Sequence, residues 1–243
     1  MDGYEPGTSF GADTAATYDD DPRGDEAAAV AFLERLAQGG PVLELAIGTG
    51  RIALPLAARG LQVDGIDFSP EMVARLRAKP GGAAIPVTMD DFAEVGVPGS
   101  YPLIYLVYNT LFNLLTQDDQ VRCFENVADH LTDEGSFVVE AFVPSFLYRL
   151  RDDQYVDAEA IKVSEVSFDV GRHDAATQRL EETHVVLSSA GVRLYPIVSR
   201  YSWPSELDLM ARIAGLRLKN RWGGWSQEPF DTNSSWHVSV YGR

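Results

Sequence analysis

Hydrophobic positions in the first half of the chain form short apolar runs that alternate with longer amphipathic stretches. The runs are four to six residues long, and each amphipathic stretch repeats its apolar positions at helical spacing. Short apolar strands that alternate with helices are typical of a parallel sheet covered on both faces. The pattern predicts strands at 42–45, 62–66, 85–89, 103–108 and 135–140, and helices within 25–40, 51–59, 69–80 and 117–131.

The hydrophobic period changes to two after about Val143. The stretches "KVSEVSFDV", "RLEETHVVLSS" and "VRLYPIVSRYSW" alternate apolar and polar residues, which predicts an antiparallel insertion at about 145–200. A last helix from 204 to 215 and strands near 216–222 and 236–241 complete the pattern. We therefore expect an α/β fold: a Rossmann-like seven-stranded sheet with an antiparallel β insertion that covers the active site.

One domain over 1–243 accounts for this pattern, because the insertion interrupts a single strand–helix series. We expect four segments within it: an N-terminal cap at 1–40, a cofactor-binding core at 41–142, the insertion at 143–202 and a C-terminal helix and hairpin at 203–243.

The stretch "VLELAIGTGRIALPLA", Val42 to Ala57, has the form of a strand, a glycine turn and a helix. Gly48 and Gly50 allow the backbone to approach a ligand closely, and the following helix directs its free N–H groups towards that ligand. Asp67 at the end of the next strand is placed to accept hydrogen bonds from the hydroxyls of a ribose. The spacing Gly48-x-Gly50-x-x-Ala53 suits a nicotinamide dinucleotide and S-adenosylmethionine equally well.

Carboxylates near the ends of three strands favour S-adenosylmethionine. Glu44 precedes Gly48 by four residues, where an acid would repel a pyrophosphate but attract an ammonium group. Asp90 and Asp91 end the third strand, where a carboxylate can accept a hydrogen bond from an adenine amine. Acids after strands one, two and three together suit a cationic ligand that carries ribose and adenine.

The stretches "ELAIGTG", "GIDFSPEMV", "MDDF" and "YLVYNTLFNLL" occur in this order between Val42 and Glu140. Here the chain resembles the class I S-adenosylmethionine-dependent methyltransferases. Within them it is most similar to actinobacterial small-molecule N- and O-methyltransferases, including the enzymes that dimethylate deoxyamino sugars. "TYDDDP", which contains Tyr18, resembles their N-terminal tyrosine segment, and "HVSVYGR" resembles their final strand.

The resemblance implies a set of cofactor-binding residues. Glu44 would approach the methionine ammonium group, Gly48 and Gly50 the methionine and ribose, and Asp67 the ribose hydroxyls. Asp90 replaces a glycine that is usual in the family, so either Asp90 or Asp91 is a candidate for the adenine amine. Ala46 stands where many members have a glycine. The other residues expected at the cofactor are Phe68, Met72, Phe92, Val107 and Tyr108.

The candidate catalytic residues are Asn113, Glu140, His184 and Tyr18. Asn113 stands where the amino-sugar enzymes have a histidine, and an amide can orient a substrate but cannot deprotonate it. Glu140 ends the fifth strand and is a candidate base or ammonium anchor. His184 lies within the insertion, where a structural role and a substrate-facing base are both open, and Tyr18 is a candidate pocket wall.

Composition narrows the partners. The net charge of −16 and the lack of a Lys/Arg cluster argue against nucleic acid and anionic membranes. Cys123 is the only cysteine, so no disulfide within the chain and no cysteine-based metal site is expected, and no other metal-ligand cluster stands out. No signal peptide or long apolar run is visible, so we expect a cytoplasmic enzyme with a small-molecule acceptor. The insertion's exposed strands offer a surface for a homodimer.

The combined prediction is an S-adenosylmethionine-dependent methyltransferase that acts on nitrogen or oxygen of a small polar molecule and releases S-adenosylhomocysteine. Two alternatives stay open. One is a non-catalytic S-adenosylmethionine-binding protein, since Asn113 replaces a histidine. The other is an NAD(P)-dependent oxidoreductase, for which the sequence offers no convincing catalytic Tyr-Lys pair. The sequence does not identify the acceptor.

Overall fold

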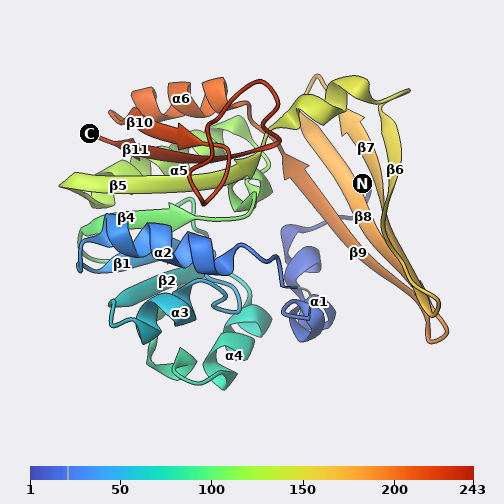
Figure 1. Ribbon diagram of the computed structural model, residues 1–243, viewed down its shortest axis with the longest axis horizontal. Helices are drawn as coiled ribbons and strands as arrows, with labels where there is room; N and C mark the ends of the chain where they lie inside the picture. The colour runs from blue at the N-terminus through green and yellow to red at the C-terminus, as the bar shows by residue number, and fades with distance from the viewer. Residues whose placement is uncertain (21) are drawn as a thin grey trace.

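A seven-stranded sheet forms the centre of the molecule (Figure 1). The computed structural model describes residues 1–20 and 22–243. The strand order is β10-β11-β5-β4-β1-β2-β3, with β1 to β5 parallel and β11 antiparallel to both β5 and β10. The strands are β1 (Val42–Leu45), β2 (Val63–Asp67), β3 (Val87–Met89), β4 (Tyr101–Leu106), β5 (Leu131–Phe142), β10 (Arg217–Trp222) and β11 (Trp236–Gly242).

Helices cover both faces of this sheet, as the alternation of strands and helices predicts. One face packs against α2, α3 and α4, and the other against α5 and α6. The helices are α2 (Glu26–Ala37), α3 (Ala53–Ala58), α4 (Pro70–Ala78), α5 (Gln117–His130) and α6 (Pro204–Ile213). Short 3-10 turns are η2 (Gly82–Ala84), η3 (Thr110–Asn113) and η4 (Pro144–Arg149). The fold class expected from the pattern is confirmed.

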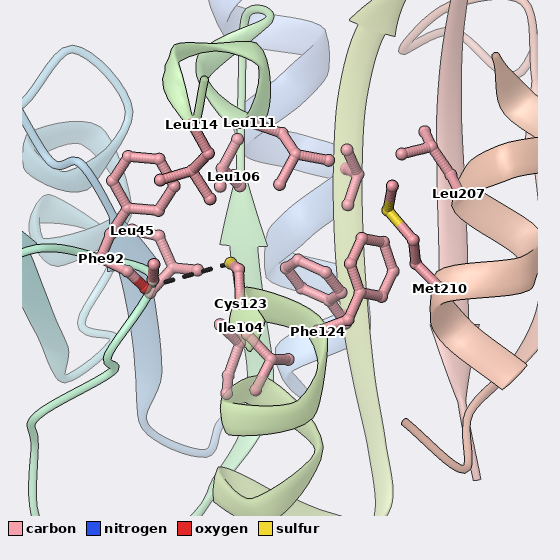
Figure 2. Packing of buried hydrophobic residues seen from close by; sticks show 14 of the residues in the cluster. Leu45, Phe92, Ile104, Leu106, Leu111, Leu114, Cys123, Phe124, Leu207 and Met210 are labelled. Atoms are coloured by element: carbon pink, nitrogen blue, oxygen red, sulfur yellow. Dashed lines mark hydrogen bonds between the residues drawn. The ribbon is translucent and has the colours of Figure 1, made fainter. Parts of the chain in front are cut away.

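Local sequence signals account for where the helices begin. Ser69 caps α4 by accepting a hydrogen bond from the Met72 amide at 3.1 Å, and Pro70 occupies the first helical position. Thr116 caps α5 in the same way through the Asp119 amide at 3.1 Å. Figure 2 shows Cys123 and Phe124 of α5 pointing from the helix into the packed core beside β4.

A second sheet stands beside the first, and its four strands are all antiparallel in the order β6-β7-β8-β9 (Figure 1). They are β6 (Gln154–Ile161), β7 (Glu165–Asp174), β8 (Arg179–Ser188) and β9 (Gly191–Arg200). The sequence pattern predicts three of these strands. It misses β6, because β6 is an edge strand whose residues are mostly exposed and whose polar alternation is weak.

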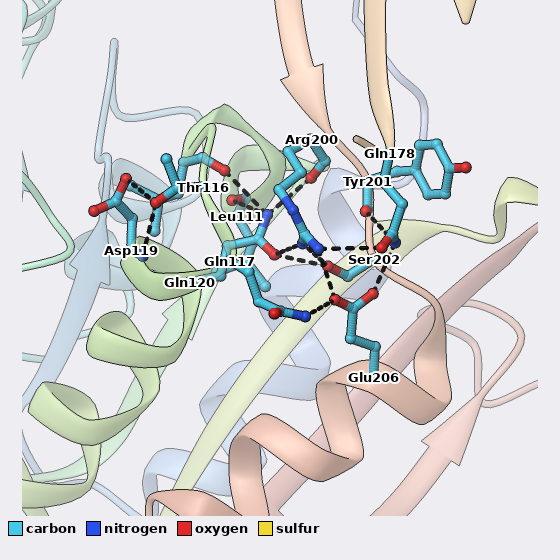
Figure 3. Close-up of polar contacts among 11 residues, drawn as sticks. Leu111, Thr116, Gln117, Asp119, Gln120, Gln178, Arg200, Tyr201, Ser202 and Glu206 are labelled. Atoms are coloured by element: carbon cyan, nitrogen blue, oxygen red, sulfur yellow. Dashed lines mark hydrogen bonds and ion pairs between the residues drawn. The ribbon is translucent and has the colours of Figure 1, made fainter. Parts of the chain in front are cut away.

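A buried polar network joins the second sheet to the helices of the first (Figure 3). Arg200 at the end of β9 donates to Gln120 of α5 at 2.8 Å and forms an ion pair with Glu206 of α6 at 2.8 Å. Gln120 is fully buried, and its amide also donates to the Arg200 carbonyl at 2.8 Å. Ser202 and Gln178 complete the network. These contacts hold the second sheet against the edge of the first.

The N-terminal segment crosses the space between the two sheets. It contains η1 (Pro6–Phe10) and α1 (Ala12–Thr17), neither of which the sequence pattern predicts. Ser9 donates to the Pro196 carbonyl of β9 at 2.7 Å, while the Phe10 carbonyl accepts from Ser69 at the start of α4 at 2.7 Å. The segment is therefore attached at both sides of the gap. No helix in the described ranges is long and apolar enough to cross a membrane.

Candidate active site

The loops after β1, β2, β3 and β4 meet at one edge of the central sheet, because parallel strands end on the same side. The first loop depends on residues with positive φ: Ala46 at 53°, Gly48 at 54° and Gly50 at 79°. A Cβ at Gly50 would lie 2.3 Å from the Leu76 side chain, so only glycine fits there. Ala46 adopts the left-handed conformation despite its Cβ, a conformation that glycine adopts with less strain.

Asp67 organises this loop. One carboxylate oxygen accepts from the Gly48 amide at 2.7 Å and the other from the Ser69 amide at 2.8 Å. Burial raises the pKa of Asp67, against the lowering effect of these amides. A cavity of about 40 Å³ beside it is lined by Phe10, Tyr18, Ala46, Gly48, Asp67, Phe68, Met72, Phe92, Thr110 and Asn113. Six of the residues expected at the cofactor therefore come together.

The two aspartates after β3 point in different directions. Asp91 lines a cavity of about 340 Å³ together with Phe68 and Phe92, and one of its oxygens accepts from the Ala93 amide at 2.8 Å. One oxygen of Asp90 accepts a hydrogen bond from the Asp91 amide at 2.8 Å, and the Asp90 side chain lies against Gly96. Of the two candidates for the adenine contact, the geometry favours Asp91.

Glu44 is buried next to strand β4. Its side chain is 2% exposed, accepts a hydrogen bond from the Tyr105 hydroxyl at 2.9 Å and lines neither the cavity beside Asp67 nor the cavity of about 510 Å³. Burial raises its pKa to about 8, against the lowering effect of Tyr105, Arg51 and the Ala53 amide. A contact between Glu44 and a methionine ammonium group stays a prediction. In the structure, the carboxyl group of Glu44 has its partners inside the protein. Gly50 also lines neither cavity and shapes the loop through its positive φ.

A strained turn follows β4. Tyr108 and Asn109 have φ values of 55° and 62°, which are unusual for residues other than glycine. Glu140 holds this turn, because one of its oxygens accepts from the Tyr108 amide at 2.7 Å and the other from the Trp225 indole at 2.6 Å. The Tyr108 ring stacks on Trp236 at 5.7 Å and lines a cavity of about 510 Å³, whereas Val107 is buried in the core.

Glu140 thus positions Tyr108 and Trp225 through its hydrogen bonds. Both its oxygens accept hydrogen bonds from protein donors, and burial raises its pKa. It lines a cavity of about 540 Å³ on the other side of Tyr108, with Gly223, Gly224 and Trp225. The geometry favours a structural role over that of a base that contacts the acceptor.

Arg23 is a site residue that the sequence pattern does not reveal. Its guanidinium lies over the Tyr108 ring, and Nη2 donates to the Tyr18 hydroxyl at 3.1 Å. Nη1 is buried and has no hydrogen-bond partner within the described chain. An unpaired buried guanidinium nitrogen suits a ligand carboxylate. The available signal is that Arg23 is the first basic residue of an otherwise acidic N-terminal stretch.

A cavity of about 510 Å³ lies between the sheet edge and the second sheet. Tyr18 and Asn113 line both this cavity and the small one beside Asp67, as do Phe10 and Thr110. The side chain of Asn113 makes no hydrogen bond to any described residue, so its amide is available to a ligand. The remaining walls include five aromatic side chains: Tyr108, Phe142, Phe146, Tyr195 and Trp236.

His184 lies on the second sheet, beyond the residues that line this cavity. Its Nδ1 is 2.9 Å from an oxygen of Asp169 and 3.3 Å from one of Glu159. The ligand atoms of the three residues lie within 4.8 Å of one another. His184 therefore belongs to an acidic cluster, and the geometry gives it no direct place beside the junction of the two cavities.

Comparisons with known proteins agree with this geometry. A family model described as "Methyltransferase domain" matches residues 42–135. The CcbJ methyltransferase from Streptomyces caelestis is 36% identical, with a TM-score of 0.92 over 98% of this chain and 99% of that chain. CalS10 from Micromonospora echinaspora, an amino pentose methyltransferase with bound S-adenosylmethionine, is 22% identical and shares the fold, with a TM-score of 0.67 over 94% and 95%.

A third relative, the cypemycin N-terminal methyltransferase of a Streptomyces species, is 23% identical over 82% of each chain. The full-length match at 36% identity and the domain match point to the same donor that the carboxylates of the site favour. The reading as a nicotinamide enzyme is thereby set aside. The chain belongs to the S-adenosylmethionine-dependent methyltransferases.

Proposed function

We propose that this enzyme methylates a nitrogen or oxygen atom of a small polar molecule that binds in the cavity of about 510 Å³. The observation that carries the proposal is the shared lining of this cavity and the one beside Asp67. An acceptor in the larger cavity can reach a donor in the smaller one only at this junction. The volume suits a small molecule rather than a macromolecule.

S-adenosylmethionine supplies a sulfonium methyl group: the acceptor's lone pair forms a bond to the methyl carbon while the carbon–sulfur electron pair stays on sulfur. The residues at the site fit this donor. Asp67 would hold the ribose hydroxyls and Asp91 the adenine amine. Arg23 would pair with the methionine carboxylate, which is the partner that its buried Nη1 lacks.

The junction residues orient the acceptor and do not deprotonate it. Phe10, Thr110 and Asn113 have no group that accepts a proton at neutral pH, and the Tyr18 hydroxyl already accepts a hydrogen bond from Arg23. Catalysis then rests on proximity and alignment, which suffices for an acceptor that presents a free lone pair. A neutral amine meets this condition more readily than an alcohol. The two relatives named for amino pentose and N-terminal substrates have acceptors of this kind.

A screen by mass spectrometry tests the proposal. The enzyme is incubated with S-adenosylmethionine and a panel of small amines, amino sugars, phenols and carboxylic acids. We expect a gain of one methylene unit on at least one acceptor, and a loss of most of this activity in Asn113→Ala with cofactor affinity retained. Asn126→Ala on α5 is the matched control, because its amide bonds the Ala93 carbonyl outside the site. No product from any acceptor class would contradict the proposal.

A further inference from the structure

The wall that the second sheet contributes to the large cavity carries a carboxylate. Glu182 on β8 lines this cavity beside Leu180 and Ile197, both apolar. Among the described lining residues, Arg23 and Glu182 are the only two whose side chains are normally charged at neutral pH. Arg23 lies at the end near Tyr108 and has a role at the cofactor. Glu182 has none there, because it does not line the small cavity beside Asp67.

Glu182 is held in place by a tyrosine from two strands away. The Tyr155 hydroxyl of β6 donates to Glu182 Oε2. Between them lies Gly171 of β7, which is paired with Tyr155 on one side and with Glu182 on the other. A Cβ at Gly171 would lie 2.1 Å from the Tyr155 ring, so the absence of a side chain there lets the ring cross β7. The arrangement fixes the direction of the carboxylate.

The second oxygen of Glu182 is available to a ligand. Oε1 makes no hydrogen bond to any residue that the structure describes, and it is not among the atoms buried without a partner. A carboxylate oxygen that is directed by a neighbour and open to a cavity can bind a cation or a hydrogen-bond donor.

The charged groups around Glu182 favour a cation as the ligand of its carboxylate. Burial raises the pKa of Glu182, and the nearby carboxylates of Asp169 and Glu159 raise it further, against the lowering effect of Tyr155 and His184. His184 next to them is paired with Asp169 at 2.9 Å. The field at Glu182 is therefore negative, which favours a positively charged group over a neutral one. The aromatic rings of Tyr195 and Phe146 offer an apolar surface beside it.

Glu182 lies apart from the point where methyl transfer would occur. The four residues that the two cavities share lie at the junction, whereas Glu182 and its neighbours are on the second sheet. A carboxylate that binds an ammonium group keeps it protonated and removes its lone pair from reaction. A cation at Glu182 is therefore held for recognition.

We propose that the methyl acceptor carries an ammonium group that Glu182 binds, and that this group is not the atom that receives the methyl. Glu182 is then a specificity residue and Tyr155 a positioning residue. The inference rests on the proposed function, since it assumes that the acceptor occupies the large cavity. It narrows the acceptor to molecules with a basic amine on one side and a second nucleophilic atom on the other.

A binding experiment tests the inference independently of turnover. Calorimetry with S-adenosylhomocysteine present compares 2-phenylethylamine with 2-phenylethanol, which have the same size but differ in charge at neutral pH. We expect wild type to bind the amine about tenfold more tightly and Glu182→Gln to bind both equally. Glu165→Gln on β7 is the control, because Glu165 pairs with Lys162 and Arg193 instead of lining the cavity, and it should keep the preference.

Equal affinity of wild type for the two probes, failure of both to bind, or a preference that survives in Glu182→Gln would overturn the inference. The result also separates it from the proposed function. An amine preference lost in Glu182→Gln, with no methylated product in the screen, would contradict methyl transfer alone. Methylated products from neutral acceptors, without an amine preference, would contradict the inference alone.

Tyr155→Phe tests the positioning role through pH. Glu182 is faced by Tyr155 and Glu159 of β6, Asp169 of β7 and His184 of β8, and by Tyr195 of β9 across the cavity wall. Loss of the phenol hydrogen bond removes an effect that lowers the pKa of Glu182. Amine binding should therefore be lost at a higher pH in Tyr155→Phe than in wild type as pH falls. A uniform loss of affinity with an unchanged pH profile would contradict the positioning role.

Discussion

Single residues at the site are held by protein partners before any ligand binds. Asp67 accepts hydrogen bonds from two backbone amides, and Glu140 accepts one from a backbone amide and one from an indole. These hydrogen bonds from protein donors fix each carboxylate in one orientation, and they limit the conformational entropy that is lost when a ligand binds. The acids also differ in their surroundings: Asp67 and Asp91 line the cavities beside the glycine loop and after β3, Glu140 holds the turn after β4, and Glu44 is buried against Tyr105.

Glu44 makes stability depend on pH. Its pKa is raised from 4.5 in the unfolded chain to about 8 by burial, so the protonated form is favoured in the folded state. The stabilisation is complete below pH 4.5 and is lost as pH rises through 8. In urea unfolding, wild type should lose roughly 3 kcal/mol relative to Glu44→Gln between pH 5 and 9.

Glu134→Gln serves as the control for this pH dependence, because Glu134 is an exposed carboxylate on β5. It should follow wild type at every pH. A constant difference in unfolding free energy between wild type and Glu44→Gln from pH 5 to 9 would show that the Glu44 carboxyl does not titrate in this range.

Elements are joined through the polar network around Arg200. This side chain is 6% exposed and connects β9 of the second sheet with α5 and α6, which cover one face of the central sheet. A buried guanidinium needs several acceptors, and Gln120, Gln178, Ser202 and Glu206 supply them. The second sheet is consequently held in one orientation, with the Glu182 side facing the cavity.

Removing this guanidinium should therefore destabilise the fold. Arg200→Met removes the ion pair of the partly buried Glu206 carboxylate and one of the two hydrogen bonds to the Gln120 amide oxygen, and we expect the free energy of unfolding to fall by about 3 kcal/mol. Arg193→Met on the same strand is the control, because its ion pair with Glu165 is exposed and 3.8 Å long, so the change should stay within about 0.5 kcal/mol. Equal urea midpoints for the two variants would disprove the role of the network.

At the scale of the whole molecule, the N-terminal segment closes the site. It is attached to the second sheet through Ser9 and to the cofactor side through Asp19, which accepts from Thr49 at 2.7 Å and from Lys79 at 2.8 Å. Burial alone would raise the pKa of Asp19, but the hydrogen bonds from Lys79 and Thr49 more than offset it and lower the pKa. Phe10 and Tyr18 of this segment line both cavities at the junction.

Weakening this attachment should speed the release of the cofactor. Asp19→Asn keeps the size of the side chain but loses the ion pair with Lys79, so we expect S-adenosylhomocysteine to dissociate several-fold faster in stopped-flow measurements, a change of roughly 1 kcal/mol. Asp20→Asn is the matched neighbour, since Asp20 is exposed and its side chain bonds no described residue. If both variants release the product at the wild-type rate, the segment does not control access.

The sequence alone determined the central sheet and the donor. Apolar runs of four to six residues and the cap at Ser69 are local signals, and the acids after strands β2 and β3 lie at the sheet edge because all parallel strands end there. Asp67, Asp91 and the glycine loop could be predicted for this reason. Four-residue spacing also singled out Glu44, but it could not show that the carboxyl is bonded to the Tyr105 hydroxyl of the neighbouring strand.

Only the tertiary structure decided what surrounds the acceptor. Arg23, Tyr155 and Glu182 come from three segments far apart in the sequence, and no spacing rule relates them. The direction of Glu182 depends on the register of β6, β7 and β8 and on a missing side chain at Gly171. A register shift of one residue would turn the acid to the other face of the sheet, so the position of this carboxylate at the cavity depends on strand pairing, which no local pattern in this chain encodes.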